Sequence, residues 1–233
     1  PVNGYIHSAF AVANDPKHCN YWINDGTGDG FSSHLHAAAQ ANWVANARIK
    51  RNMRCVTIEP RLSTSAAKSE EWIPIRPATD RHFALGLCHV MVKERRCDYE
   101  FLRKDTNAPY LVSPDGTFMR NAEGKIYIWD TKANSAKLWD DPSIGEFALE
   151  GTYQVEGKEC KPAFQKFVDI LEDCTPEKMS EFTTVPAETI VRIAREFSDA
   201  ATIGATIEID GRTLPLRPAG YNYYRGAQGH KHG

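Results

Sequence analysis

Short apolar runs alternate with helical patterns over the first 95 residues of the chain. The runs at 21–23 and 55–58 are rich in aromatic and β-branched residues, which favours buried strands. Between them an apolar residue recurs every four positions, at Leu35, Ala39, Trp43 and Ala47, and predicts a helix with one buried stripe. This rhythm indicates a layered α/β fold.

A second helix is predicted just after the proline-rich extended stretch 72–77. It begins at Thr79 or Asp80, and the spacing of Phe83, Leu87 and Val90 gives it a buried face.

Helical periodicity weakens between residues 105 and 160, where turn signals such as Ser-Pro-Asp-Gly separate short aromatic runs. We expect an irregular set of hairpins there. Helical patterns return after residue 161, with Thr175-Pro176 as an N-cap and first helical residue. Farther on, Asp210-Gly211 is a plausible hairpin turn.

The bulk composition narrows the class of protein. The chain has 233 residues, with 28 Lys plus Arg against 30 Asp plus Glu, and this balance argues against a nucleic-acid partner. No apolar stretch is long enough to span a membrane, and no signal peptide is visible. Because the chain starts at Pro1, we expect both ends to be cuts in a longer polypeptide, so its compartment stays open. The six scattered cysteines lack a C-x-x-C pair and predict no metal cluster within the chain.

Two predicted strands end in unusual loops. The first, 26–30, contains three glycines that allow backbone N–H groups to approach an anion, although a tight turn explains them as well. The second, Glu59-Pro60-Arg61, puts an acid at a strand tip, where nucleotide-binding sheets present a carboxylate to ribose hydroxyls.

Arg76 and Asp80 add a third element. An aspartate accepts two hydrogen bonds from guanine, and an arginine pairs with phosphate in a forked geometry. Asp80 is equally well placed to cap the predicted helix. The histidine pairs match no metal-binding signature and favour surface or core packing.

The run 56–67, followed by 71–80, resembles the large subunits of the dimethyl sulfoxide reductase family of molybdopterin oxidoreductases. The family pattern is D-P-R-x-[ST]-x-[ST]-A and then W-[IL]-P-I-R-P-G-T-D, and the spacing matches throughout. Similar stretches follow in order at 98–112, 175–197 and 225–233, so the resemblance covers nearly the whole chain.

The chain departs from the family pattern at a few positions. Glu59 replaces the commoner Asp, and Ala78 and Thr184 each replace a Gly. The first loop reads Asp25-Gly26-Thr27-Gly28-Asp29, where the family usually has W-G-[ST]-N-P or F-G-[ST]-Q. The family's iron–sulfur cysteines and its metal ligand have no counterpart here, so we assign no catalytic and no metal-binding residue.

The resemblance implies a bis-molybdopterin guanine dinucleotide cofactor with molybdenum or tungsten, and a 4Fe-4S cluster in a preceding N-terminal part. By position it implies phosphate, ribose, guanine and pterin contacts. The residues expected to contact the cofactor are Gly26, Thr27, Gly28, Glu59, Pro60, Arg61, Arg76, Asp80, Gly226, Gln228 and His230.

The fold that the resemblance implies is a layered Rossmann-like dinucleotide-binding domain with a turn-rich β insertion and additional helices. Its parts would be 1–104 for nucleotide binding, 105–160 for the hairpin insertion, and 161–233 for a helical segment leading into a second cofactor-contacting loop.

The implied function is two-electron redox or oxygen-atom transfer on a small-molecule substrate, as in anaerobic respiration, and the implied partner is an iron–sulfur electron-transfer subunit. A nicotinamide-dependent dehydrogenase is one alternative, but its G-x-G-x-x-G loop is missing near residue 26. A non-catalytic nucleotide-binding module is the other.

Overall fold

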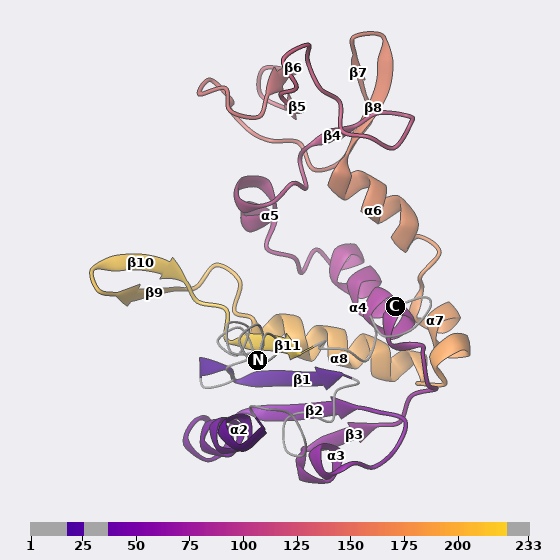
Figure 1. Cartoon of the computed structure of the whole chain (residues 1–233), viewed down its shortest axis with the longest axis vertical. Coiled ribbons are helices and arrows are strands. Elements are labelled where there is room, and N and C mark those ends of the chain that lie inside the picture. Colours follow the sequence, from indigo (N-terminus) through magenta and orange to yellow (C-terminus); the bar gives the residue numbers. More distant parts are fainter. Residues whose placement is uncertain (1–17, 26–36, 223–233) are drawn as a thin grey trace, which may run out of the picture. The chain divides into compact units, whose positions relative to one another are not determined.

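The structure is a computed structural model that describes residues 18–25 and 37–222 (Figure 1). The chain divides into two compact units. Unit 1 comprises residues 1–96 and 174–233, and unit 2 comprises residues 97–173. The three-part division expected from the sequence stays a prediction.

Unit 1 is built on a parallel sheet of four strands in the order β11-β1-β2-β3. The strands are β1 (Tyr21–Asp25), β2 (Arg54–Ile58), β3 (Glu71–Ile73) and β11 (Ala219–Asn222). Every residue of β1 is buried, as expected of a central parallel strand that is covered on both faces. The two strands predicted at 21–23 and 55–58 are confirmed and lie side by side.

Helices cover both faces of this sheet (Figure 1). On one side lie α2 (Ala37–Arg51) and the short α3 (Thr64–Lys68). On the other side lies α8 (Ala187–Ala200), against which α4 (Asp80–Lys93) and α7 (Pro176–Thr183) pack. The α/β architecture predicted from the alternating pattern is therefore confirmed.

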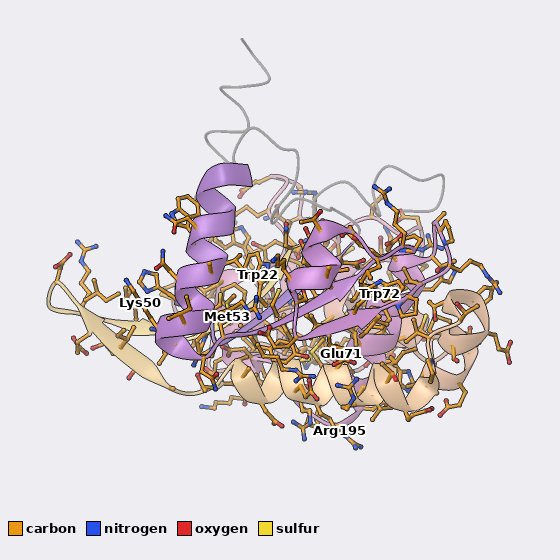
Figure 2. All side chains as sticks on the ribbon, turned by 90° about the horizontal axis from the view of Figure 1, so that it is seen from below. Trp22, Lys50, Met53, Glu71, Trp72 and Arg195 are labelled. Carbon is orange, nitrogen blue, oxygen red and sulfur yellow. The ribbon has the colours of Figure 1, made fainter. Side chains whose placement is uncertain are left out.

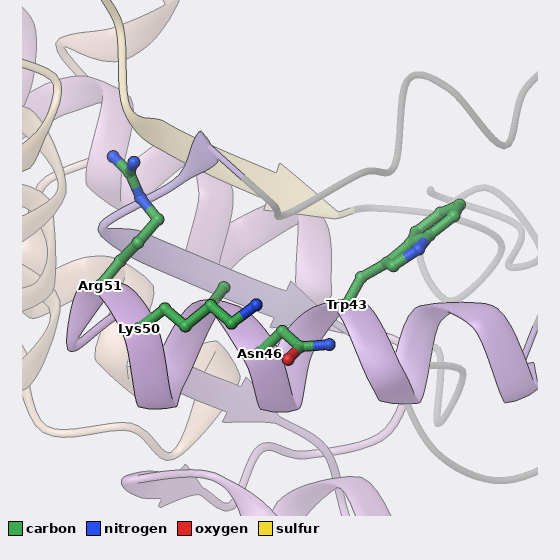
Figure 3. Close-up of a pocket in the computed structure, with 5 residues that line it drawn as sticks. Trp43, Asn46, Lys50 and Arg51 are labelled. Carbon is green, nitrogen blue, oxygen red and sulfur yellow. The ribbon is translucent and has the colours of Figure 1, made fainter.

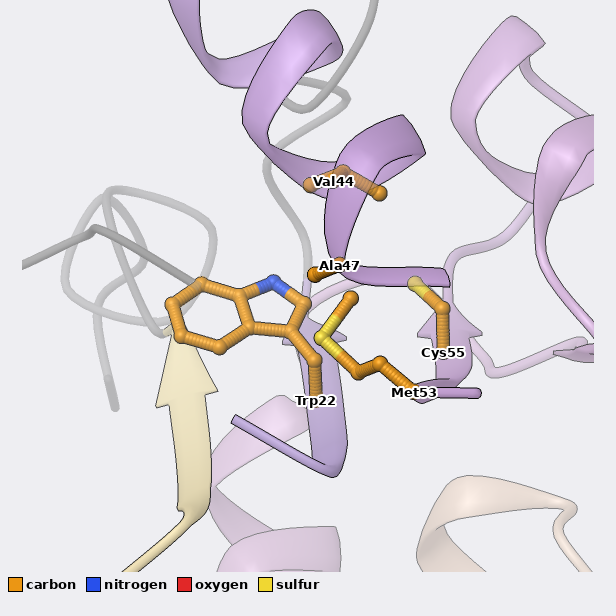
Figure 4. Close-up of a cluster of buried hydrophobic side chains, with 5 residues drawn as sticks. All are labelled: Trp22, Val44, Ala47, Met53 and Cys55. Atoms are coloured by element: carbon orange, nitrogen blue, oxygen red, sulfur yellow. The ribbon is translucent and has the colours of Figure 1, made fainter. Parts of the chain in front are cut away.

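The core beneath α2 corrects one expectation. Val44 and Ala47 of this helix pack on Trp22, Met53 and Cys55 (Figure 4). The predicted stripe placed Trp43 in the core, but Trp43 is only partly buried, and Leu35 lies outside the described residues. The helix rotates 100° per residue, so i+3 and i+4 positions share one face, and the sheet selects the first of them here.

Glycine 220 allows a close approach between two strands on this face. Trp22 and Gly220 are paired in the register of β1 and β11, and a Cβ at Gly220 would lie 2.4 Å from the Trp22 ring. Only glycine therefore leaves room for the indole in this arrangement.

The opposite face carries aromatic rings and charges. The ring of Phe197 on α8 packs edge-on against those of Tyr21 and Tyr221. At the amino ends of the strands, Arg54 and Glu71 join Arg192 and Glu196 of α8 in one ion-pair network. Figure 2 shows Glu71 beside this helix, together with Arg195, which pairs with Glu94.

Packing among α4, α7 and α8 follows the predicted faces. Phe83, Leu87 and Val90 are buried on α4, and Ile190 and Ile193 are buried on α8. The predicted N-cap is confirmed, because the Thr175 side chain accepts a hydrogen bond from the Lys178 N–H and Pro176 begins α7. Pro186 lies one position earlier than expected, at the N-cap of α8.

A hairpin of β9 (Thr206–Ile209) and β10 (Arg212–Pro215) precedes β11. Its two turn residues, Asp210 and Gly211, have φ angles of 50° and 74°. Positive φ at both positions is the signature of a two-residue hairpin turn, so the turn predicted there is confirmed.

Unit 2 consists of short antiparallel strands and two helices. The sheets are β4-β8-β7 and β5-β6. Buried Leu111, Met119, Val155 and Cys160 form its core. The elements are α5 (Tyr99–Asp105), β4 (Leu111–Val112), β5 (Tyr127–Asp130), β6 (Ser135–Leu138), β7 (Tyr153–Val155), β8 (Lys158–Pro162) and α6 (Ala163–Leu171).

One buried carboxylate organises the end of the β5-β6 hairpin. Asp130 is 1% exposed and accepts hydrogen bonds from the backbone N–H groups of Gly145 (2.9 Å) and Glu146 (3.1 Å). It also accepts from the N–H of Lys132 at 3.0 Å and pairs with Lys137 at 2.7 Å. These donors, the Gly145 N–H foremost, lower the pKa of Asp130 far below its ordinary range.

We expect Asp130→Asn to loosen this loop, because an amide replaces an acceptor-only group among fixed donors. Hydrogen exchange at the Gly145 and Glu146 amides should accelerate. Since the folded pKa is lowered, the advantage of the native Asp should be complete above about pH 4 and decline as pH falls further. Asp140→Asn, in an exposed pair with Lys125, is the matched control. Equal exchange rates in both variants would contradict the assignment.

Two residues of unit 1 hold left-handed backbone conformations that suit glycine. Ala78, before α4, has φ 66°, and Thr184, the C-cap of α7, has φ 64°. These are the two positions at which the family pattern has Gly. A left-handed residue with a Cβ carries a steric cost of roughly 1–2 kcal/mol, and a β-branched side chain is especially unfavourable there.

Thr184→Gly should therefore raise the free energy of unfolding by about 1 kcal/mol in chemical denaturation. Thr183→Gly is the matched control and should have the opposite sign. Thr183 is buried and helical, and its hydroxyl donates to the Met179 carbonyl at 2.9 Å. A loss of stability in both variants would show that Thr184 is not strained.

Candidate functional site

Three buried acids meet at the carboxyl edge of the parallel sheet. Asp25 ends β1, Glu59 directly follows β2, and Asp80 begins α4 after the loop that follows β3. Their exposed fractions are 0%, 5% and 4%. Open α/β sheets bind ligands at this edge, where loops and helix N-termini converge.

The backbone of Glu59 is held by β3. Its N–H donates to the Ile73 carbonyl at 3.2 Å, and the indole N–H of Trp72 donates to the Glu59 carbonyl at 2.9 Å. Pro60 and Arg61 follow and are exposed. The strand tip therefore presents the Glu59 side chain inward and the next two residues to solvent.

Asp80 owes its position to a pinned loop. The Arg76 N–H donates to the Thr183 carbonyl at 2.9 Å, and the Thr79 hydroxyl donates to the Arg76 carbonyl at 2.7 Å. Thr79 takes the N-cap position, so Asp80 is the first helical residue rather than the cap. There the helix dipole stabilises a negative charge. The Arg76 side chain is exposed and lies 3.5 Å from the Glu181 carbonyl.

Asp25 is joined to β11. The Tyr221 hydroxyl donates to Asp25 Oδ2, and one residue on in β11, Asn222 Nδ2 donates to Asn24 Oδ1 at 2.9 Å. Burial raises the pKa of Asp25 well above its usual range. The charges of Asp80 and Glu59 raise this pKa further, and the Tyr221 hydrogen bond lowers it. The three acids therefore share one electrostatic environment.

Asp25, Tyr221 and Asn222 were not predicted as site residues. For Asp25 a signal was present, because it lies at a strand end immediately before the glycine-rich loop, as Glu59 lies at the end of the next strand. No local signal points to Tyr221, which lies 196 positions from its partner.

The remaining predicted residues cannot be placed. Outside the described ranges lie Gly26, Thr27, Gly28, Gly226, Gln228 and His230. Of the predicted set, the structure brings Glu59 and Asp80 together and leaves Pro60, Arg61 and Arg76 exposed around them.

The chemistry of this edge suits a ligand that presents N–H and O–H donors. Carboxylates are strong acceptors, and two of them side by side match the donor edge of a guanine or the hydroxyls of a ribose. Within residues 18–25 and 37–222 no group of three or more His, Cys, Asp or Glu is arranged to hold a metal ion. The helices in those ranges are all too short or too polar to cross a bilayer.

A separate hollow of about 290 Å³ lies beside α2. Figure 3 shows Trp43, Asn46, Lys50 and Arg51 along one side of the helix. Arg51 donates to the Asn20 side chain at 3.0 Å. The hollow shares no residue with the acid cluster.

Several curated proteins are similar to this chain. The perchlorate reductase alpha chain from Dechloromonas aromatica is 30% identical over 203 residues, which cover 69% of this chain and 22% of that protein. A sulfite dehydrogenase from Allochromatium vinosum is 30% identical and covers 63% of this chain and 17% of that protein. The dimethyl sulfoxide reductase DmsA of Escherichia coli is 31% identical, over 66% of this chain and 15% of its own length.

The chain thus spans about a fifth of the length of the curated relatives it matches. No family model matches it. Among solved structures, acetylene hydratase from Pelobacter acetylenicus aligns with a TM-score of 0.49 and 17% identity, over 91% of this chain and 21% of that one.

Proposed function

Because the chain belongs to the dimethyl sulfoxide reductase family of molybdopterin oxidoreductases, we propose that it supplies part of the site for one guanine dinucleotide of a molybdenum or tungsten cofactor. The observation that carries the proposal is the meeting of buried Glu59 and Asp80 at the carboxyl edge of a parallel sheet. A Rossmann-like arrangement of the nucleotide on this sheet follows from the same edge.

Each of the two acids has a proposed partner. Asp80 accepts from N1 and N2 of the guanine, and its charge is supported by the N-terminus of α4. Glu59 accepts from ribose hydroxyls, as acids at strand tips do in nucleotide-binding sheets. Burial excludes competing water and strengthens both sets of hydrogen bonds.

The phosphates require a different environment, since carboxylates repel them. We assign them to the exposed cations Arg61 and Arg76 and to the loop of Gly26, Thr27 and Gly28. Pro60 ends the strand beside them. On the pterin side we propose Gly226, Gln228 and His230.

The whole protein is proposed to be the catalytic subunit of an oxidoreductase that acts on a small-molecule substrate. The cofactor would supply two-electron redox or oxygen-atom transfer chemistry, and the residues of this chain would bind and orient it. Support comes from the names of the relatives, which are two reductases and a dehydrogenase. A 4Fe-4S cluster and an iron–sulfur partner subunit belong to the same proposal.

Asp80→Asn should reduce cofactor retention by the full-length subunit. An amide presents a donor to the guanine N–H groups, and losing a charge-assisted pair costs about 1.5–3 kcal/mol, or roughly ten- to a hundredfold in affinity. The measurement is molybdenum or tungsten by mass spectrometry, together with guanine nucleotide released per protein.

Glu188→Gln is the matched control, because Glu188 is an exposed acid in the first turn of another helix, α8. It should retain the cofactor at the native level. Full retention in Asp80→Asn, with circular dichroism unchanged, would refute the proposed guanine contact.

A further inference from the structure

Asp25 is a buried acid to which the proposed contacts give no role. Its side chain is fully buried, and the hydroxyl of Tyr221 donates to Oδ2. Oδ1 is also buried and has no hydrogen-bond partner among the described residues. In the family pattern the same position holds an aromatic residue, so this acid is particular to the chain.

An ionised carboxylate is an unfavourable state for this side chain on energetic grounds. A buried charged oxygen without a donor bears its full desolvation cost, which a proton on that oxygen removes. Burial raises the pKa of Asp25, and so do the charges of Asp80 and Glu59. Neutral Asp25 has one O–H to donate and one oxygen to accept from Tyr221.

The helix decides which member of the Asp25–Asp80 pair carries the proton. Asp80 occupies the first position of α4, where the positive end of the helix dipole favours a carboxylate. Asp25 ends a β-strand, and strands have only a small dipole. The negative charge therefore belongs to Asp80 and the proton to Asp25.

We infer that Asp25 is a positioning residue whose neutral carboxyl donates a hydrogen bond to Asp80 and orients the carboxylate that binds the purine. Tyr221 holds the other oxygen of Asp25 and so fixes the direction of the donated bond. This inference rests on the proposed function for the identity of the ligand. The location of the proton does not.

The arrangement makes nucleotide binding sensitive to pH. The groups that face Asp25 are Tyr221 from β11, Glu59 after β2 and Asp80 from α4. When pH rises through the folded-state pKa of Asp25, its proton is lost, the bond to Asp80 breaks, and a third negative charge appears at the edge. Binding should therefore be strong below that pKa and weaken above it.

The test is calorimetric titration of the cofactor-free full chain with GDP from about pH 6 to pH 9, a span that brackets a raised carboxyl pKa. The native Kd should increase with pH, by up to about tenfold per unit above the pKa. Asp25→Asn mimics the neutral acid, since its amide accepts from Tyr221 and donates to Asp80, and its Kd should not change with pH. Asp25→Leu should bind weakly throughout.

Infrared difference spectroscopy provides an arm that needs no nucleotide. The native chain should show the carbonyl stretch of a protonated carboxyl at neutral pH, and Asp25→Asn should lack it. Absence of the band in the native chain, or identical pH profiles of GDP binding in native and Asp25→Asn, would overturn the inference. If the band is present and no variant binds GDP, the proposed nucleotide site fails while the proton on Asp25 stands.

Discussion

The burial of three acids at one edge of a parallel sheet is the constraint on which the rest of unit 1 depends. Charged carboxylates are costly to bury unless hydrogen bonds, a helix dipole or protonation compensates them. The structure offers a different compensation for each of two acids, since Asp80 starts a helix and Asp25 takes a hydroxyl from β11. A ligand rich in N–H and O–H donors would complete the arrangement.

The opposite edge of the sheet explains why this arrangement can be rigid. There the ion pairs of Arg54 and Glu71 tie the amino ends of β2 and β3 to α8. At the carboxyl edge, backbone bonds from Arg76 and the indole of Trp72 fix the loops that carry the acids. Strain at Ala78 and Thr184 is the cost of bending the chain tightly enough to bring α4 and α7 to this edge.

Local sequence signals predicted much of the fold. Strands β1 and β2, the start of α4, the Thr175 cap and the Asp210-Gly211 turn depend on nearby residues, so pattern and turn chemistry suffice to find them. The face of α2 was wrong because burial of Trp43 depends on Trp22 and Met53 in the sheet, which a four-residue spacing does not encode.

The same distinction applies to the site. Glu59 and Asp80 follow recognisable strand and helix boundaries, so the sequence pointed to both. Tyr221 and Asn222 reach the edge only because β11 pairs with β1 from almost 200 positions away, and long-range pairing leaves no local trace. Convergence of the acids in space had to come from the structure.

The central claim is that a guanine nucleotide binds at the carboxyl edge of this sheet. Its most direct test is a GDP titration of the cofactor-free full chain, followed through the carboxyl-carbon NMR resonances of its Asp and Glu side chains. The account predicts that the resonances of Glu59 and Asp80 move together and saturate at one Kd. Shifts confined to Trp43 and Lys50 at the hollow beside α2, with both carboxyl resonances unchanged, would contradict it.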